Sequence, residues 1–159
     1  MNGKIVAGGI VIAGALVGAG IWYAQVHAYY TRIAATAPEA VIRLVSVVSG
    51  EPEDIGAEGF EGIDAGSSPL RFRACFTVPL SLATLTETYV LAEDPVPLIG
   101  PGWFDCYDAR RIGAALESGE ALAFLSEPDI HPGVDRIVAV FQDGHAYAWQ
   151  QLNAEGLAE

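Results

Sequence analysis

Apolar and polar positions are distributed very differently in the first 30 residues and in the rest of the chain. Lys4 is the only Lys, Arg, Asp or Glu before Arg32, and residues 5–24 form an uncharged, largely apolar run. About 20 such residues, at 1.5 Å per residue in a helix, cover the roughly 30 Å of a bilayer's hydrocarbon core. We therefore expect a transmembrane helix that contacts the lipid bilayer through residues 5–24, within an N-terminal anchor and linker of residues 1–37.

The end of this apolar run allows a second interpretation. Val26 and Ala28 flank His27 with small residues at the two positions that a signal peptidase reads. Cleavage there would release a soluble periplasmic domain. The apolar run is longer than the apolar region of a typical signal peptide, which favours the anchor. A positive charge at Lys4 before the run favours a cytoplasmic N-terminus with the domain in the periplasm.

Residues 38–159 carry a mixture of strand-like and helix-like apolar patterns. Predicted helices grouped between predicted strands are typical of an α+β fold with a mostly antiparallel sheet, and we expect one extracytoplasmic domain of this class. Residues 49–69 hold six acids, five glycines and no base, which predicts a long mobile loop. Residues 93–102 hold three prolines and should be irregular. The predicted strands are residues 40–48, 70–78, 121–125, 136–142 and 145–151, and the predicted helices are residues 81–90 and 109–118.

Two local signals give finer expectations. Asp108 and Gly119 have the residue types that begin and end a helix. Asp143 and Gly144 form the dipeptide favoured in two-residue hairpin turns. A two-residue turn sets the strand register, and the expected pairs are Val140 with Tyr147 and Val138 with Trp149 on one face, and Phe141 with Ala146 and Ala139 with Ala148 on the other.

The charge of the outer domain restricts its partners. Six arginines, no lysine and all 20 acids follow Arg32, a balance of −14. Long-range attraction to nucleic acid or to anionic lipid head groups is therefore excluded. Another membrane or periplasmic protein is the expected partner.

Cys75 and Cys106 are the chain's two cysteines. In an oxidising compartment they are expected to pair and to close a loop of 31 residues. The alternative is a reactive thiol at Cys106, which neighbouring acids would hinder and a following helix N-terminus would favour. Neither a CxxC motif nor a spacing of Cys and His typical of zinc sites occurs.

Other candidate chemistry is sparse. The chain lacks the common nucleophile, phosphate-binding, dinucleotide and zinc-protease motifs, so no catalytic, cofactor-binding or metal-ligating residue is assigned and no cofactor is expected. Asp129 and His131, or the acids of residues 49–69, are the alternative basis for a small-ligand or metal-handling module. Within the apolar run, Gly14 and Gly18 form a GxxxG pattern that permits close packing of two membrane helices.

Several segments together resemble an uncharacterised family of small single-pass proteins from alphaproteobacteria. They are MNGKIVAG, SSPLRFRACF, GWFDCYDA, ESGEALAF and IHPGVDRIVAVFQDGHAYAW. The resemblance implies a bacterial inner-membrane location and supplies no activity. The expected function is a non-enzymatic, membrane-anchored periplasmic interaction or accessory protein, such as a subunit or assembly factor of a membrane complex.

Overall fold

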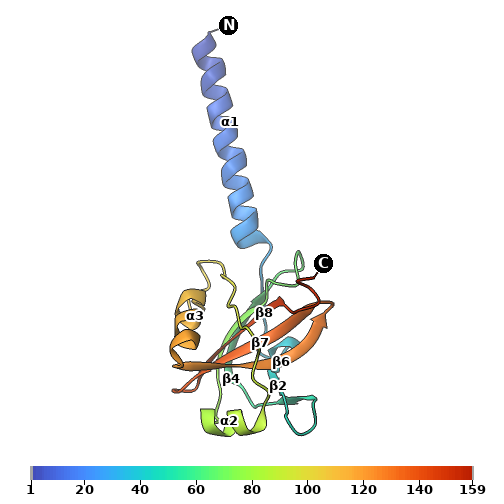
Figure 1. The fold of residues 1–159 in the computed structure, drawn as a ribbon. Helices are drawn as coiled ribbons and strands as arrows, with labels where there is room; N and C mark the ends of the chain where they lie inside the picture. Colours follow the sequence, from blue (N-terminus) through green and yellow to red (C-terminus); the bar gives the residue numbers. More distant parts are fainter. Residues whose placement is uncertain (1, 159) are drawn as a thin grey trace. The chain divides into compact units, whose positions relative to one another are not determined.

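A computed structural model describes residues 2–158 and divides them into two compact units, with the boundary between Tyr30 and Thr31. The first unit is one long helix, α1 (Gly3–Tyr23), which continues as a π-helical turn, η1 (Ala24–Ala28) (Figure 1). None of the residues of α1 is buried. This helix is long and apolar enough to span a membrane, and a signal sequence would have the same properties.

The second unit is built on a six-stranded antiparallel sheet with the strand order β1-β4-β5-β8-β7-β6, and a separate two-stranded sheet of β2 and β3 (Figure 1). Two α-helices and one short 3-10 helix complete it, which confirms the predicted α+β class. The strands are β1 (Thr31–Ile33), β2 (Arg43–Val45), β3 (Pro52–Asp54), β4 (Glu58–Asp64), β5 (Arg73–Thr77), β6 (Ala121–His131), β7 (Val134–Phe141) and β8 (His145–Leu152); the helices are η2 (Pro38–Ala40), α2 (Leu82–Thr88) and α3 (Ala109–Ser118).

Two expectations about irregular regions are wrong. The predicted linker contains β1, and the predicted mobile loop of residues 49–69 contains β3 and β4. Strand β4 lacks an apolar alternation of its own, and it forms because it pairs with β1 and β5. Its register shifts by one residue between Glu58 and Glu61, where Gly59 takes a φ of 65°. Glycine supplies this left-handed conformation without a steric cost and so permits the bulge.

The predicted register of the β7–β8 hairpin is also wrong, by one residue. Val140 pairs with Ala146 and Ala139 with Tyr147, because the connection has three residues, 142–144, instead of two. Gly144 donates its N–H to the carbonyl of Phe141 and has a φ of 85°, as in three-residue hairpin loops that end in a left-handed glycine. A one-residue slip exchanges the faces of a strand, so Ala146 and Ala148 lie on the same face as Val138 and Val140.

The sheet is covered on both faces. One face packs against α2 and the β2–β3 sheet, around Phe72, Phe124 and Leu85. On the opposite face, Tyr147 contacts Tyr107 just before α3, and Phe141 contacts Arg111 within α3. Helix α3 begins and ends as predicted: the Asp108 carboxylate accepts the N–H groups of Arg110 and Arg111, and Gly119 closes the helix with a φ of 78°.

The hairpin turn yields a stability prediction. A Cβ at Gly144 would lie 3.1 Å from the carbonyl oxygen of Val78 and would have to accept the left-handed φ. Gly144→Ala should therefore lower the free energy of unfolding by about 1–2 kcal/mol. Gly113 lies within α3 with open space around its Cβ position, so the control Gly113→Ala should raise that free energy by up to about 1 kcal/mol.

Chemical denaturation of the full chain, followed by tryptophan fluorescence, measures both variants. Equal stability of the Gly144→Ala variant and the unmodified chain would contradict the assigned turn.

Candidate functional site

The proline-rich segment, residues 92–107 between α2 and α3, runs along one face of the sheet without joining it as a strand. Pro95, Pro97 and Pro101 have no amide N–H to donate, so this backbone cannot form a regular ladder. Only its start makes sheet-like bonds, where the N–H of Ala92 donates to the carbonyl of Ala123. Beyond that point its position depends on side chains that reach out from the sheet.

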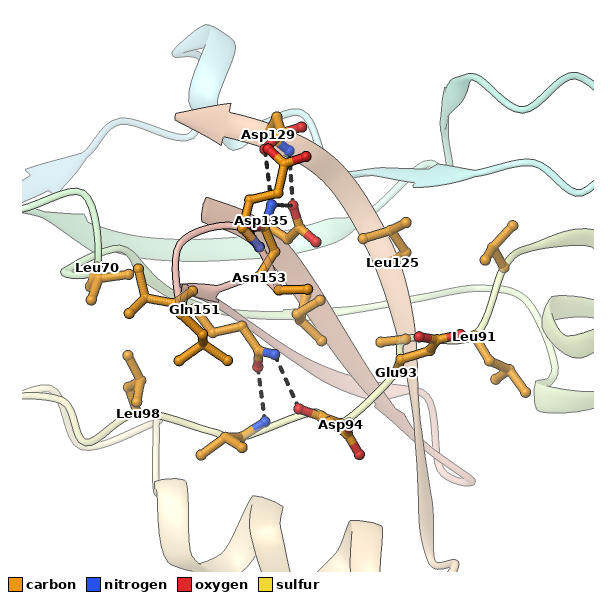
Figure 2. A pocket seen from close by; sticks show the side chains of 18 residues that line it. Leu70, Leu91, Glu93, Asp94, Leu98, Leu125, Asp129, Asp135, Gln151 and Asn153 are labelled. Atoms are coloured by element: carbon orange, nitrogen blue, oxygen red, sulfur yellow. Dashed lines mark hydrogen bonds between the residues drawn. The ribbon is translucent and has the colours of Figure 1, made fainter. Parts of the chain in front are cut away.

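Gln151 of β8 makes the first of these attachments (Figure 2). Its Oε1 accepts the backbone N–H of Val96 at 2.8 Å, and its Nε2 donates to the carbonyl oxygen of Asp94 at 3.1 Å. Oε1 also accepts the indole N–H of the buried Trp149 at 3.0 Å. One amide side chain therefore replaces the ladder bonds that the prolines prevent.

Arg73 of β5 makes the second attachment. Its side chain is buried, and its guanidinium donates to the carbonyl oxygens of Leu98 at 2.8 Å and Ile99 at 3.0 Å. A further nitrogen donates to the carbonyl of Leu70, which ties the loop before β5 to the same group. Arginine suits this task because its donors form a planar fork that reaches several carbonyls at once.

The third attachment is covalent. The Sγ atoms of Cys75 in β5 and Cys106 before α3 are 2.15 Å apart, and their Cα atoms are 6.3 Å apart. The structure thus brings together the two cysteines that were expected to pair. Tyr107 follows directly, packs edge-on against Tyr147 and lies under the Arg73 guanidinium. Burial raises the pKa of the Tyr107 hydroxyl.

The attached segment forms one wall of a groove of about 700 Å³ (Figure 2). Leu125 and Ile137 of the sheet line it, together with Gln151, and the chain after β8 forms a second wall. Its apolar side chains include Leu91, Val96 and Leu157, which are 51%, 58% and 73% exposed. Large apolar side chains that are exposed together at one concave site are typical of a binding surface.

The wall after β8 is also fixed in place. Asn153 donates from Nδ2 to the carboxylates of Asp129 at 2.9 Å and Asp135 at 3.0 Å, as Figure 2 shows. Its Oδ1 accepts the N–H groups of Glu155 and Gly156 and so closes a turn. Gly156 is required here, because a Cβ at that position would meet the carbonyl oxygen of Gly133.

The remaining residues singled out in the sequence do not converge on this groove. Asp129 lines it, whereas His131 lies in a separate hollow with Asp64, so the structure does not bring the suggested Asp–His pair together in one site. Among residues 2–158, no group of three or more His, Cys, Asp or Glu is placed to hold a metal ion. Gly14 and Gly18 lie in α1 with open space around their Cβ positions, and their packing role stays a prediction.

The comparisons with known proteins place the outer domain in a family. Residues 42–159 match the sequence model of a family of unknown function, DUF6446. The chain belongs to this family. No curated protein and no solved structure matches the chain.

The DUF6446 match includes the cysteine pair, Arg73, Gln151 and the whole groove lining, and it begins after α1. Gln151, Arg73 and Asn153 were missed as functional positions in the sequence. The sequence contains one indication of Arg73, which is a charged residue within a predicted strand of alternating apolar positions. It contains none of Gln151 and Asn153, since their partners are distant in the chain.

The cysteine pair gives a testable expectation for the DUF6446 chain. Cys75→Ala and Cys106→Ala should each lower the free energy of unfolding by about 3.5–4 kcal/mol, because either change opens the same loop of 31 residues. The double variant should be nearly as stable as each single variant, since the partners share one interaction.

Denaturant titration measures these stabilities. Thiol labelling of the denatured protein is the control: no cysteine should be labelled before reduction, and both should be labelled after it. Labelling of native Cys106, together with unchanged stability of the variants, would instead establish a reactive thiol.

Proposed function

We propose that this protein is a membrane-anchored interaction protein whose outer domain binds another membrane or periplasmic protein in the groove, without catalysing a reaction. The groove itself is the observation that carries this proposal. It combines exposed leucine and valine side chains with walls held by Gln151 and Asn153, so binding would require little reordering of the site.

The chemistry of the lining supports binding over catalysis. Among the described residues of the groove there is no Ser, Thr, Cys, Lys or His, and two of its five carboxylates, those of Asp129 and Asp135, are bonded to Asn153. An accessory or assembly role in a membrane complex fits such a surface. A small apolar ligand is the second candidate, because a volume of about 700 Å³ lies within the range of small-molecule sites.

The proposed location is a bacterial inner membrane, with the N-terminus in the cytoplasm and the outer domain in the periplasm. An apolar helix of suitable length and a cysteine pair at bonding distance support it, because disulfides persist in oxidising compartments. Lys4 before the helix supports the orientation.

Reporter fusions test the topology. Alkaline phosphatase fused after Glu159 should be active, because it folds only after export. A fluorescent protein that becomes fluorescent only in the cytoplasm should show no fluorescence at the same position. The opposite pair of results would reverse the orientation. An N-terminal tag that stays on a full-length protein in the membrane fraction distinguishes an anchor from a cleaved signal peptide.

Photocrosslinking in living cells tests the binding function. A photoreactive residue in place of Val96, in the groove wall, should yield a discrete adduct with one protein at native expression. The same residue in place of Val48, which is 92% exposed in the turn between β2 and β3, is the matched control and should yield none. Failure of the Val96 position to give any protein adduct would contradict the proposal, and an adduct only with a small molecule would support the second candidate.

A further inference from the structure

The charge of the groove lining restricts the chemistry of the partner. Among residues 2–158, five carboxylates line it and no Lys, Arg or His does. The carboxylates of Asp129 and Asp135 accept hydrogen bonds from Asn153. The other three belong to exposed residues on the two walls, Glu93, Asp94 and Glu155.

These carboxylates are spread along the groove. Glu93 and Asp94 belong to the proline-rich wall, and Glu155 belongs to the wall after β8. The described residues contain no group of three acids placed for one metal ion. Negative charge on both sides of an apolar floor is complementary to separate basic side chains that flank an apolar surface.

The backbone of the two walls is not available to pair with an added strand. On the proline-rich wall, the N–H of Val96 and the carbonyl of Asp94 are both bonded to Gln151, and the residues on either side of Val96 are prolines. On the other wall, the N–H groups of Glu155 and Leu157 bond to Asn153. Since neither wall offers a free row of amides, recognition would depend on side chains, as it does for a helix in a groove.

We infer that the groove binds a basic amphipathic helix of the partner protein. The apolar stripe of that helix contacts Leu91, Leu125 and Leu157, and its Lys or Arg side chains pair with Glu93, Asp94 and Glu155. This inference rests on the proposed function and specifies the partner's chemistry.

A designed peptide pair provides the probe. One peptide places leucines at helical spacing with lysines beside the stripe, and its matched control replaces every lysine with glutamate. The full chain, held in phosphatidylcholine nanodiscs, is titrated against each fluorescently labelled peptide, and binding to empty nanodiscs is subtracted. The lysine peptide should bind at least tenfold more tightly, and added salt should weaken it.

Variants locate the binding. The double variant Glu93→Gln, Glu155→Gln should lower the affinity for the lysine peptide roughly 3- to 10-fold, as expected for the loss of two exposed ion pairs. Glu117→Gln with Glu120→Gln removes the same charge outside the groove, from exposed residues at and just after the end of α3, and should leave the affinity within about twofold. Leu91→Ser should also weaken binding, whereas Val48→Ser should not.

Equal binding of the two peptides, or an equal loss in the two pairs of charge variants, would overturn the inference. In that case a protein adduct from the Val96 position would still support the proposed function, with a partner recognised by apolar contacts alone. Absence of that adduct would overturn the proposed function itself.

Discussion

Three attachments between the sheet and a proline-rich segment determine the shape of the outer domain on one face. Arg73 and Cys75, two positions apart, lie on the same side of β5, and Gln151 projects from the adjacent β8. Because the segment's prolines cannot donate hydrogen bonds, no ladder would hold it if these side chains were lost. The path from Asp94 to Tyr107 therefore follows from the sheet register, and so does the groove that this path encloses.

The buried arginine shows how strongly the fold depends on this arrangement. A guanidinium without partners inside a protein would cost several kcal/mol, so its burial requires polar groups around it. Arg73 obtains carbonyl oxygens from two loops that are adjacent only in the folded chain. The same contacts that satisfy this charge thus position the wall of the groove. Structural stability and the binding surface therefore depend on the same interactions. The disulfide between Cys75 and Cys106 attaches the C-terminal end of the segment to β5 covalently.

Much of this architecture could be predicted because its signals are local. Asp108 and Gly119 define α3, and the alternation around Phe72 and Phe76 defines β5. The hairpin register was wrong because the same Asp–Gly dipeptide also fits a three-residue loop. Strand β4 was missed because pairing with its neighbours, and not its own pattern, makes it a strand.

The groove could not be predicted for a related reason. Gln151 contacts Asp94 and Val96, which are more than 50 positions away in the chain, and a single glutamine near a strand end carries no pattern. The acids of the lining were visible in the sequence only as part of a general negative charge. Their distribution on two walls depends on the turn that Asn153 closes, which is a property of the folded chain.

Amide hydrogen exchange at Val96 tests the central claim most directly, namely that side chains of the sheet hold the proline-rich wall. In the oxidised full chain this amide should be protected by its bond to Gln151. In a Gln151→Leu variant it should exchange at least tenfold faster, while amides of the β7–β8 ladder keep their rates. Exchange of Val96 at the rate of an open loop in the unmodified protein, or protection that survives the loss of Gln151, would contradict the account.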